Sequence, residues 1–178
     1  MLPLAHEQAT VPSFFRMVPE SSIVHFAGHA VANPDVPSES LLLFAPARGG
    51  HRGVLIAEEL LARLQSNQTR LFVMAACSTA GGVPIGAEGL APLVRPILAA
   101  GVPAVVGSLW DIPDYAARML FGFFHQHYRE GRDADVALQL AQQDMLRGTE
   151  LSKSPALWGS FQMTGFASSP FGNRKERK

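Results

Sequence analysis

The sequence is poor in cysteine and has no excess of charge of either sign. One cysteine stands among 178 residues, and 15 Lys and Arg residues balance 15 Asp and Glu residues. A single cysteine excludes an intrachain disulfide and a zinc site built from several thiolates. Nucleic-acid-binding proteins usually carry surplus positive charge, so this balance argues against nucleic acid as a partner. No two histidines stand beside a carboxylate at a metal-ligand spacing, so we expect neither a metal nor another cofactor.

Long uninterrupted apolar runs are missing too. The first ten residues hold no basic stretch followed by an apolar run, so no secretory signal is predicted. Residues 90–110 have the length of a membrane span and carry one charge, but prolines and glycines interrupt them at Pro92, Pro96, Gly101, Pro103 and Gly107. The sequence therefore predicts a soluble domain of the cytoplasm that does not bind a membrane.

What the chain does have is enough apolar content for one sizeable core, since 47% of its residues are hydrophobic. Apolar runs of strand length alternate with helical patterns. The strands are expected at 22–27, 41–44, 54–55, 71–76, 104–109 and 158–164, and the longer helices at 56–64, 90–100, 113–131 and 133–145. Continuous apolar strands are typical of parallel sheets with both faces covered. We expect an α/β fold with a mostly parallel sheet.

Two residues with catalytic chemistry, His29 and Cys77, each follow a predicted strand closely. In a parallel sheet the carboxyl ends of the strands meet at one edge, where functional sites lie. An imidazole can take the proton of a thiol and later protonate a leaving amine, so this pair suits nucleophilic catalysis. The alternative is that Cys77 is a small buried apolar residue. His25, within a strand, and His125 and His127, on a helix, are not expected to take part.

Five short motifs occur in order along the chain: HFAGH at 25–29, AACST at 75–79, GAEGL at 86–90, SLWDIPD at 108–114 and WGSF at 158–161. Together they resemble the CHAT domain, a family of caspase-like cysteine peptidases related to separase and gingipains. The resemblance implies a three-layer caspase-like sandwich over residues 1–168. The last residues are rich in Lys and Arg, so we expect a disordered basic tail at 169–178. The resemblance also implies a further N-terminal strand beside the His29 strand, which we expect this chain to lack. Either the sequence is an N-terminally truncated fragment of a larger protein, or another chain covers that edge.

The resemblance further implies a catalytic dyad, with His29 as the base and Cys77 as the nucleophile. The backbone N–H groups of Gly28, Ala30 and Cys77 are expected to bind the oxyanion that forms when the thiolate attacks. Ala30 stands where the family usually has glycine. Alanine keeps the N–H group but narrows the backbone conformations that this position can adopt.

A substrate pocket is expected from Trp110 and from three acidic residues near the same rim, Glu88, Asp111 and Asp114. A carboxylate in an apolar pocket favours Lys or Arg before the scissile bond, because the two charges pair. Asp114 fits the family's pattern best. The alternative interpretation of Asp114 is that it caps the helix that starts beside Pro113.

These observations favour a cysteine endopeptidase that hydrolyses a protein or peptide substrate without a cofactor. By resemblance, an upstream helical-repeat region such as a TPR array, or a partner chain, is expected to accompany it. The main alternative is a catalytically inactive interaction module of a larger signalling or defence protein, which Ala30 and the short N-terminus favour. A third alternative is a small-molecule hydrolase or acyltransferase that uses the same cysteine.

Overall fold

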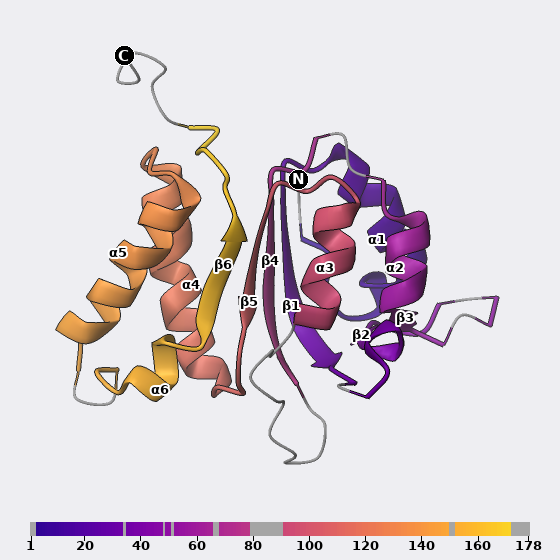
Figure 1. Cartoon of the computed structure of the whole chain (residues 1–178), viewed down its shortest axis with the longest axis horizontal. Coiled ribbons are helices and arrows are strands. Elements are labelled where there is room, and N and C mark those ends of the chain that lie inside the picture. The colour runs from indigo at the N-terminus through magenta and orange to yellow at the C-terminus, as the bar shows by residue number, and fades with distance from the viewer. Residues whose placement is uncertain are drawn as a thin grey trace.

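A computed structural model describes residues 3–33, 35–47, 49–50, 52–65, 68–78, 91–149 and 152–171. Its centre is a six-stranded sheet, which stands edge-on between two groups of helices in Figure 1. The strand order is β3-β2-β1-β4-β5-β6. The strands span Ile23–Val31 (β1), Leu41–Leu43 (β2), Val54–Ile56 (β3), Leu71–Ser78 (β4), Ala104–Ser108 (β5) and Phe161–Gly165 (β6).

Most of the strands run in one direction. β1, β4 and β5 are parallel neighbours, and β2 and β6 are antiparallel to β1 and β5. β3 is antiparallel to β2 and so runs the same way as β1. Four of the six strands therefore share one direction, which confirms the predicted mostly parallel sheet.

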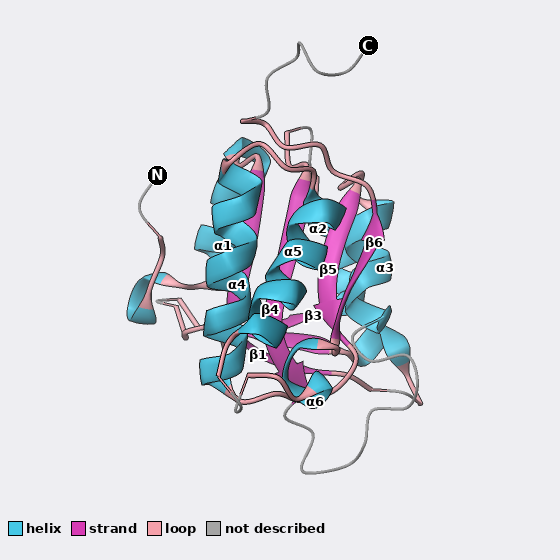
Figure 2. Ribbon diagram, turned by 90° about the vertical axis from the view of Figure 1, so that its left-hand side faces the viewer, coloured by secondary structure: helices cyan, strands magenta, loops and turns pink. Residues whose placement is uncertain are grey.

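Helices cover both faces of the sheet and make a three-layer sandwich. On one face lie α1 (Val11–Met17), α2 (Ala57–Arg63) and α3 (Ala91–Ala99), and on the other α4 (Asp114–Arg129) and α5 (Ala134–Arg147), with the short α6 (Pro155–Trp158) beside β6. Figure 2 looks onto the face that α4 and α5 cover. Three short 3-10 helices complete the fold, at His6–Gln8, Val18–Glu20 and Pro37–Glu39. No helix among the described residues has the length and apolar character needed to cross a bilayer.

The two cores form because alternate residues of the central strands point to opposite faces. Phe72 and Met74 of β4 join the core under α1, α2 and α3, where Phe14 and Leu60 also lie. The intervening Val73 belongs to the core under α4 and α5. This burial on both faces is why the strand reads as one continuous apolar run in the sequence.

β1 and β4 continue further than the apolar pattern predicts. β1 runs to Val31 rather than ending at residue 27, and β4 runs to Ser78 rather than to 76. The end of β1 is stabilised from both sides, by β4 and by antiparallel β2, which pairs with His29–Val31. His29 and Cys77 therefore lie within the ends of their strands and not in the loops that follow.

The first six residues of β1, Ile23–Gly28, pair with β4 alone among the described strands, because β2 reaches only the last three residues. This unpaired edge is where the expected N-terminal strand of the family would lie. One face of β1 is also open, since Ala27 and His29 are exposed while Phe26 and Ala30 on the other face are buried. A parallel strand is usually covered on both faces and both edges.

The packed part of the chain extends past the predicted boundary at residue 168. Ser169 is buried, and its N–H donates to the Asp133 carboxylate at 3.1 Å. Its hydroxyl donates to the backbone carbonyl of Tyr128 at 2.7 Å. Residues 172–178 of the predicted tail lie outside the described residues.

Candidate active site

His29 and Cys77 are register partners in the parallel ladder between β1 and β4. Adjacent strands lie about 4.8 Å apart, so the backbones of the two residues stand side by side at the carboxyl end of the sheet. His29 is also the first residue of β1 that pairs with β2, opposite Leu43. The sequence prediction that these two residues meet at one rim agrees with this register.

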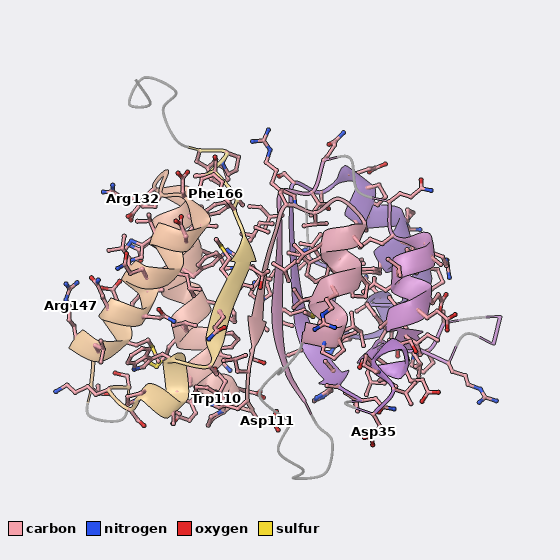
Figure 3. The ribbon with its side chains drawn as sticks, in the orientation of Figure 1. Asp35, Trp110, Asp111, Arg132, Arg147 and Phe166 are labelled. Carbon is pink, nitrogen blue, oxygen red and sulfur yellow. The ribbon has the colours of Figure 1, made fainter. Side chains whose placement is uncertain are left out.

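A cavity of about 1130 Å³ opens beside His29, between the open face of β1 and the side of α4. β1 contributes a row of alternate residues to its wall, which ends with Ala27 and His29. Asp111, which precedes α4, and Asp114, the first residue of α4, also line this cavity. Figure 3 shows Asp111 at the end of the sheet where β1 and β4 finish. The structure therefore brings two of the predicted pocket acids to the same cavity as the predicted base.

Asp114 does not cap α4. Pro113 holds the N-cap position, with extended backbone, and Asp114 is the first helical residue. An acidic side chain in the first helical turn still interacts favourably with the helix dipole. The capping alternative for Asp114 is thus wrong, and its exposed carboxylate is left at the mouth of the cavity.

Trp110 is not among the described residues that line this cavity. Its indole N–H donates to the backbone carbonyl of Ala156 in α6 at 2.9 Å, and 41% of the residue is exposed. This bond directs the ring toward α6, which separates it from His29. Glu88, the third predicted pocket acid, lies outside the described residues.

Gly28, Ala30 and Cys77 all lie inside the β1–β4 ladder, where Gly28 pairs with Ala76 and Ala30 with Ser78. An N–H group that donates to a neighbouring strand is not free to bind a substrate oxygen. The predicted oxyanion role of these groups therefore requires the strand ends to separate, and it stays a prediction.

Packing explains the two small residues that flank His29. A Cβ atom on Gly28 would come within 2.9 Å of the ring of Phe26, so glycine makes room for that ring. Ala30 is fully buried in the core under α1, α2 and α3. The methyl group that replaces the family's usual glycine therefore fills the core.

His25 and His125 form a contact that the sequence interpretation missed. The Nδ1 atom of His25 lies 2.6 Å from the Nε2 atom of His125, across the cavity between β1 and α4. Desolvation, followed by repulsion from His125, lowers the pKa of His25 to about 4. Desolvation and then the charge of Arg129 lower the pKa of His125. The sequence did hold a signal for His25: it lies four residues before His29, and therefore on the same face of the strand.

No three side chains of the metal-ligating types gather anywhere in the part of the chain that the structure describes. His127, the third of the histidines that were set aside, bonds the Asp144 carboxylate at 2.7 Å and so ties α4 to α5. This contact joins two packed helices, so His127 has a structural role.

A three-layer α/β sandwich with a histidine and a cysteine on adjacent parallel strands defines a caspase-like domain. The CHAT domain profile matches residues 2–166, nearly the whole chain, and the chain therefore belongs to the CHAT domain family.

Two curated relatives carry the name Tetratricopeptide repeat protein 28. The mouse protein is 29% identical over 96 residues, which are 54% of this chain and 4% of the relative. The human protein is 31% identical over 81 residues, which are 46% of this chain and 3% of the relative. The chain thus spans only a few per cent of the length of these relatives. By name, both are proteins with helical repeats.

Proposed function

We propose that this CHAT domain is a cysteine endopeptidase in which His29 is the general base and Cys77 is the nucleophile. The observation that carries the proposal is the register of β1 and β4, which pairs His29 with Cys77 beside an open cavity. A catalytic base must come within hydrogen-bond reach of the group it deprotonates, and adjacent positions on paired strands allow this.

The reaction has two steps. The Cys77 thiol gives its proton to His29, and the thiolate attacks the scissile carbonyl carbon. When the C–N bond breaks, His29 returns the proton to the leaving amine and an acyl-thioester remains on Cys77. His29 then takes a proton from water, the hydroxide attacks the thioester, and the acid is released with the thiol restored.

The acids beside His29 suggest the substrate class. The cavity that His29 lines holds Arg118 and Arg129 as well as two carboxylates, those of Asp111 and Asp114. A lysine or arginine side chain bound there would pair with them. We therefore propose a protein substrate cleaved after a basic residue, with Glu88 as a further candidate acid.

The context of the domain is also a proposal. The curated relatives are tetratricopeptide repeat proteins. We expect a helical-repeat region or a partner chain to present the substrate, and we expect the protein to act in the cytoplasm.

One observation favours a second candidate, a catalytically inactive interaction module with the same fold. Gly28, Ala30 and Cys77 are all committed to the β1–β4 ladder. A domain without free oxyanion donors would lose one of the largest contributions to catalysis. It would then act by presenting surfaces rather than by cleaving peptides.

A covalent probe separates these two functions. An acyloxymethyl ketone peptide with lysine beside the ketone should label Cys77, because the thiolate displaces the acyloxy group. Since Cys77 is the single cysteine, the mass of the intact protein reports labelling at one site. We expect His29→Ala to slow labelling at least tenfold, and His6→Ala, a matched exposed histidine, to leave it unchanged. Equal labelling of the wild type and His29→Ala would favour the inactive module.

A further inference from the structure

Ser108, the last residue of β5, bonds the backbone next to Cys77. Its hydroxyl donates to the carbonyl oxygen of Ala76 at 3.0 Å, and both residues are only 2% exposed. The paired positions of β4 and β5 are Phe72 with Val105 and Val73 with Val106. Ala76 lies three residues beyond the last of these pairs. Beyond the paired residues, the side chain of Ser108 therefore links β5 to the end of β4.

This bond sets the orientation of the peptide group that joins Ala76 to Cys77. The Ala76 carbonyl points toward β5, because Ser108 reaches it from that strand. In a trans peptide the C=O and N–H groups point in opposite directions. The N–H of Cys77 consequently points toward β1, the strand of His29.

Ser108 is itself firmly held on its other side. It pairs with Phe161 in the antiparallel β5–β6 ladder. The next residue, Leu109, donates its N–H to the carbonyl of Ser160 at 2.9 Å. The hydroxyl therefore projects from a backbone that β6 fixes, and it can act as a stationary anchor for the end of β4.

We propose that Ser108 is a positioning residue for Cys77: its hydroxyl holds the Ala76–Cys77 peptide so that Cys77 stays in register with His29. The proposal rests on the proposed function, since it matters for catalysis only if His29 and Cys77 form the dyad. Ser108 touches neither the substrate nor the reacting atoms. It acts because small displacements of a nucleophile from its base lower the reaction rate strongly.

A purely structural role for Ser108 makes a different prediction. A buried carbonyl that loses its donor costs stability, and the protein would melt at a lower temperature. The reactivity of the Cys77 thiol in the folded protein would not change. The decisive measurement is therefore made on the thiol.

The experiment compares Ser108→Ala, Ser108→Thr and Ser160→Ala with the wild type. Threonine keeps the hydroxyl and tests rescue. Ser160 is a matched control because it is fully buried, and its hydroxyl has no hydrogen-bond partner within the described part of the chain. The rate of Cys77 alkylation by iodoacetamide is measured across pH on folded protein, together with labelling by the lysine acyloxymethyl ketone peptide.

We expect Ser108→Ala to slow alkylation of Cys77 at pH 6.5 about tenfold, because the thiol is no longer held beside His29. The maximal rate of probe labelling should fall by a similar factor, with the half-saturating probe concentration unchanged. Ser108→Thr should restore both values to within about threefold, and Ser160→Ala should match the wild type. If Ser108→Ala does not fold, Ser108→Val is compared with Ser108→Thr, which has the same shape and keeps the hydroxyl. Alkylation about tenfold slower in Ser108→Val then supports the proposal, and equal rates refute it.

Failure of this proposal is distinguishable from failure of the dyad. If His29→Ala alters the alkylation profile but Ser108→Ala does not, the dyad stands and the role of Ser108 is refuted. If His29→Ala has no effect while Ser108→Ala still changes the profile, the dyad is refuted, and with it the proposal that Ser108 aligns Cys77 with His29. If neither variant changes the profile, both proposals are refuted.

Discussion

Asp114 is the residue whose meaning changed most between sequence and structure. Its position after Pro113 suggested a helix cap, but Pro113 itself holds that position. What remains is a carboxylate at the mouth of the cavity beside His29. It is exposed rather than partly buried, so solvent weakens its attraction for a cationic substrate group.

Reversal of this charge should alter substrate preference by a limited amount. We expect Asp114→Lys to lower kcat/KM for a fluorogenic peptide with lysine before the scissile bond about fivefold, because exposed charge pairs are worth about 1 kcal/mol. Cleavage of the matching norleucine peptide should be unchanged. Asp35→Lys, an exposed acid on another part of the molecule (Figure 3), is the control. Equal losses on both peptides would remove Asp114 from substrate selection.

At the scale of elements, β1 and α4 meet through the imidazoles of His25 and His125. Protonation of both rings would place two positive charges within hydrogen-bond distance of each other. Desolvation, and then this repulsion from His125, keep His25 neutral in the folded protein and lower its pKa to about 4. In the unfolded chain the same imidazole titrates near its usual value of about 6.5.

This difference predicts a loss of stability in acid. Between pH 6.5 and 4 the unfolded chain binds a proton at His25 that the folded chain does not, so the free energy of unfolding falls as the pH falls. Above pH 6.5 the contribution of His25 is constant. Urea unfolding at pH 7 and at pH 5 measures the fall, which His25→Gln should reduce. If His25→Gln has the same acid dependence as the wild type and the His6→Gln control, the histidine contact does not govern it.

The elements themselves were largely predictable because their signals are local. Thr10 precedes an apolar helical face, and its hydroxyl oxygen accepts the N–H of Ser13 at the start of α1. The run at 71–76 is apolar throughout because both faces of β4 are buried. Such patterns need only neighbouring residues to be read.

The rest of the site depends on partners that are distant in the chain. The end of β1 is set by pairing with β2, and this part of β1 carries a histidine that interrupts the apolar pattern. Trp110 was expected in the substrate pocket, but its indole bonds Ala156, 46 residues further on. His25 and His125 are 100 residues apart. No local rule relates such positions, so the carboxyl-end rule could place His29 and Cys77 together but could not define the walls around them.

At the scale of the whole molecule, the main irregularity is the half-paired strand β1. Six of its residues lack a neighbour on one edge among the described strands, and one face above them opens into the cavity. Unpaired backbone donors and acceptors at a sheet edge are a template for another strand. Apart from His25 the residues of this edge are apolar, and residues of α1 lie beside them on the buried side.

The isolated chain should therefore self-associate through this edge. We expect its mass from light scattering to rise with concentration, and Ala27→Lys to reduce that rise, because a charge on an edge strand opposes pairing. Ala27 faces the open side of β1, so lysine there can reach solvent. Leu61→Lys, at a residue of α2 that is 52% exposed, is the matched control. Association that Leu61→Lys reduces and Ala27→Lys does not would assign the interface to α2.

The parallel ladder between β1 and β4 also determines at which stage of folding His29 and Cys77 come together. Every register partner in that ladder, from Ile23 with Leu71 to Ala30 with Ser78, is 48 positions away in the chain. His29 can meet Cys77 only after a loop of this length has closed, and closure of long loops is costly in entropy and slow. A ribosome that is making this protein finishes the histidine well before the cysteine emerges. The nascent chain can therefore form the proposed dyad only after β1 and β4 have paired.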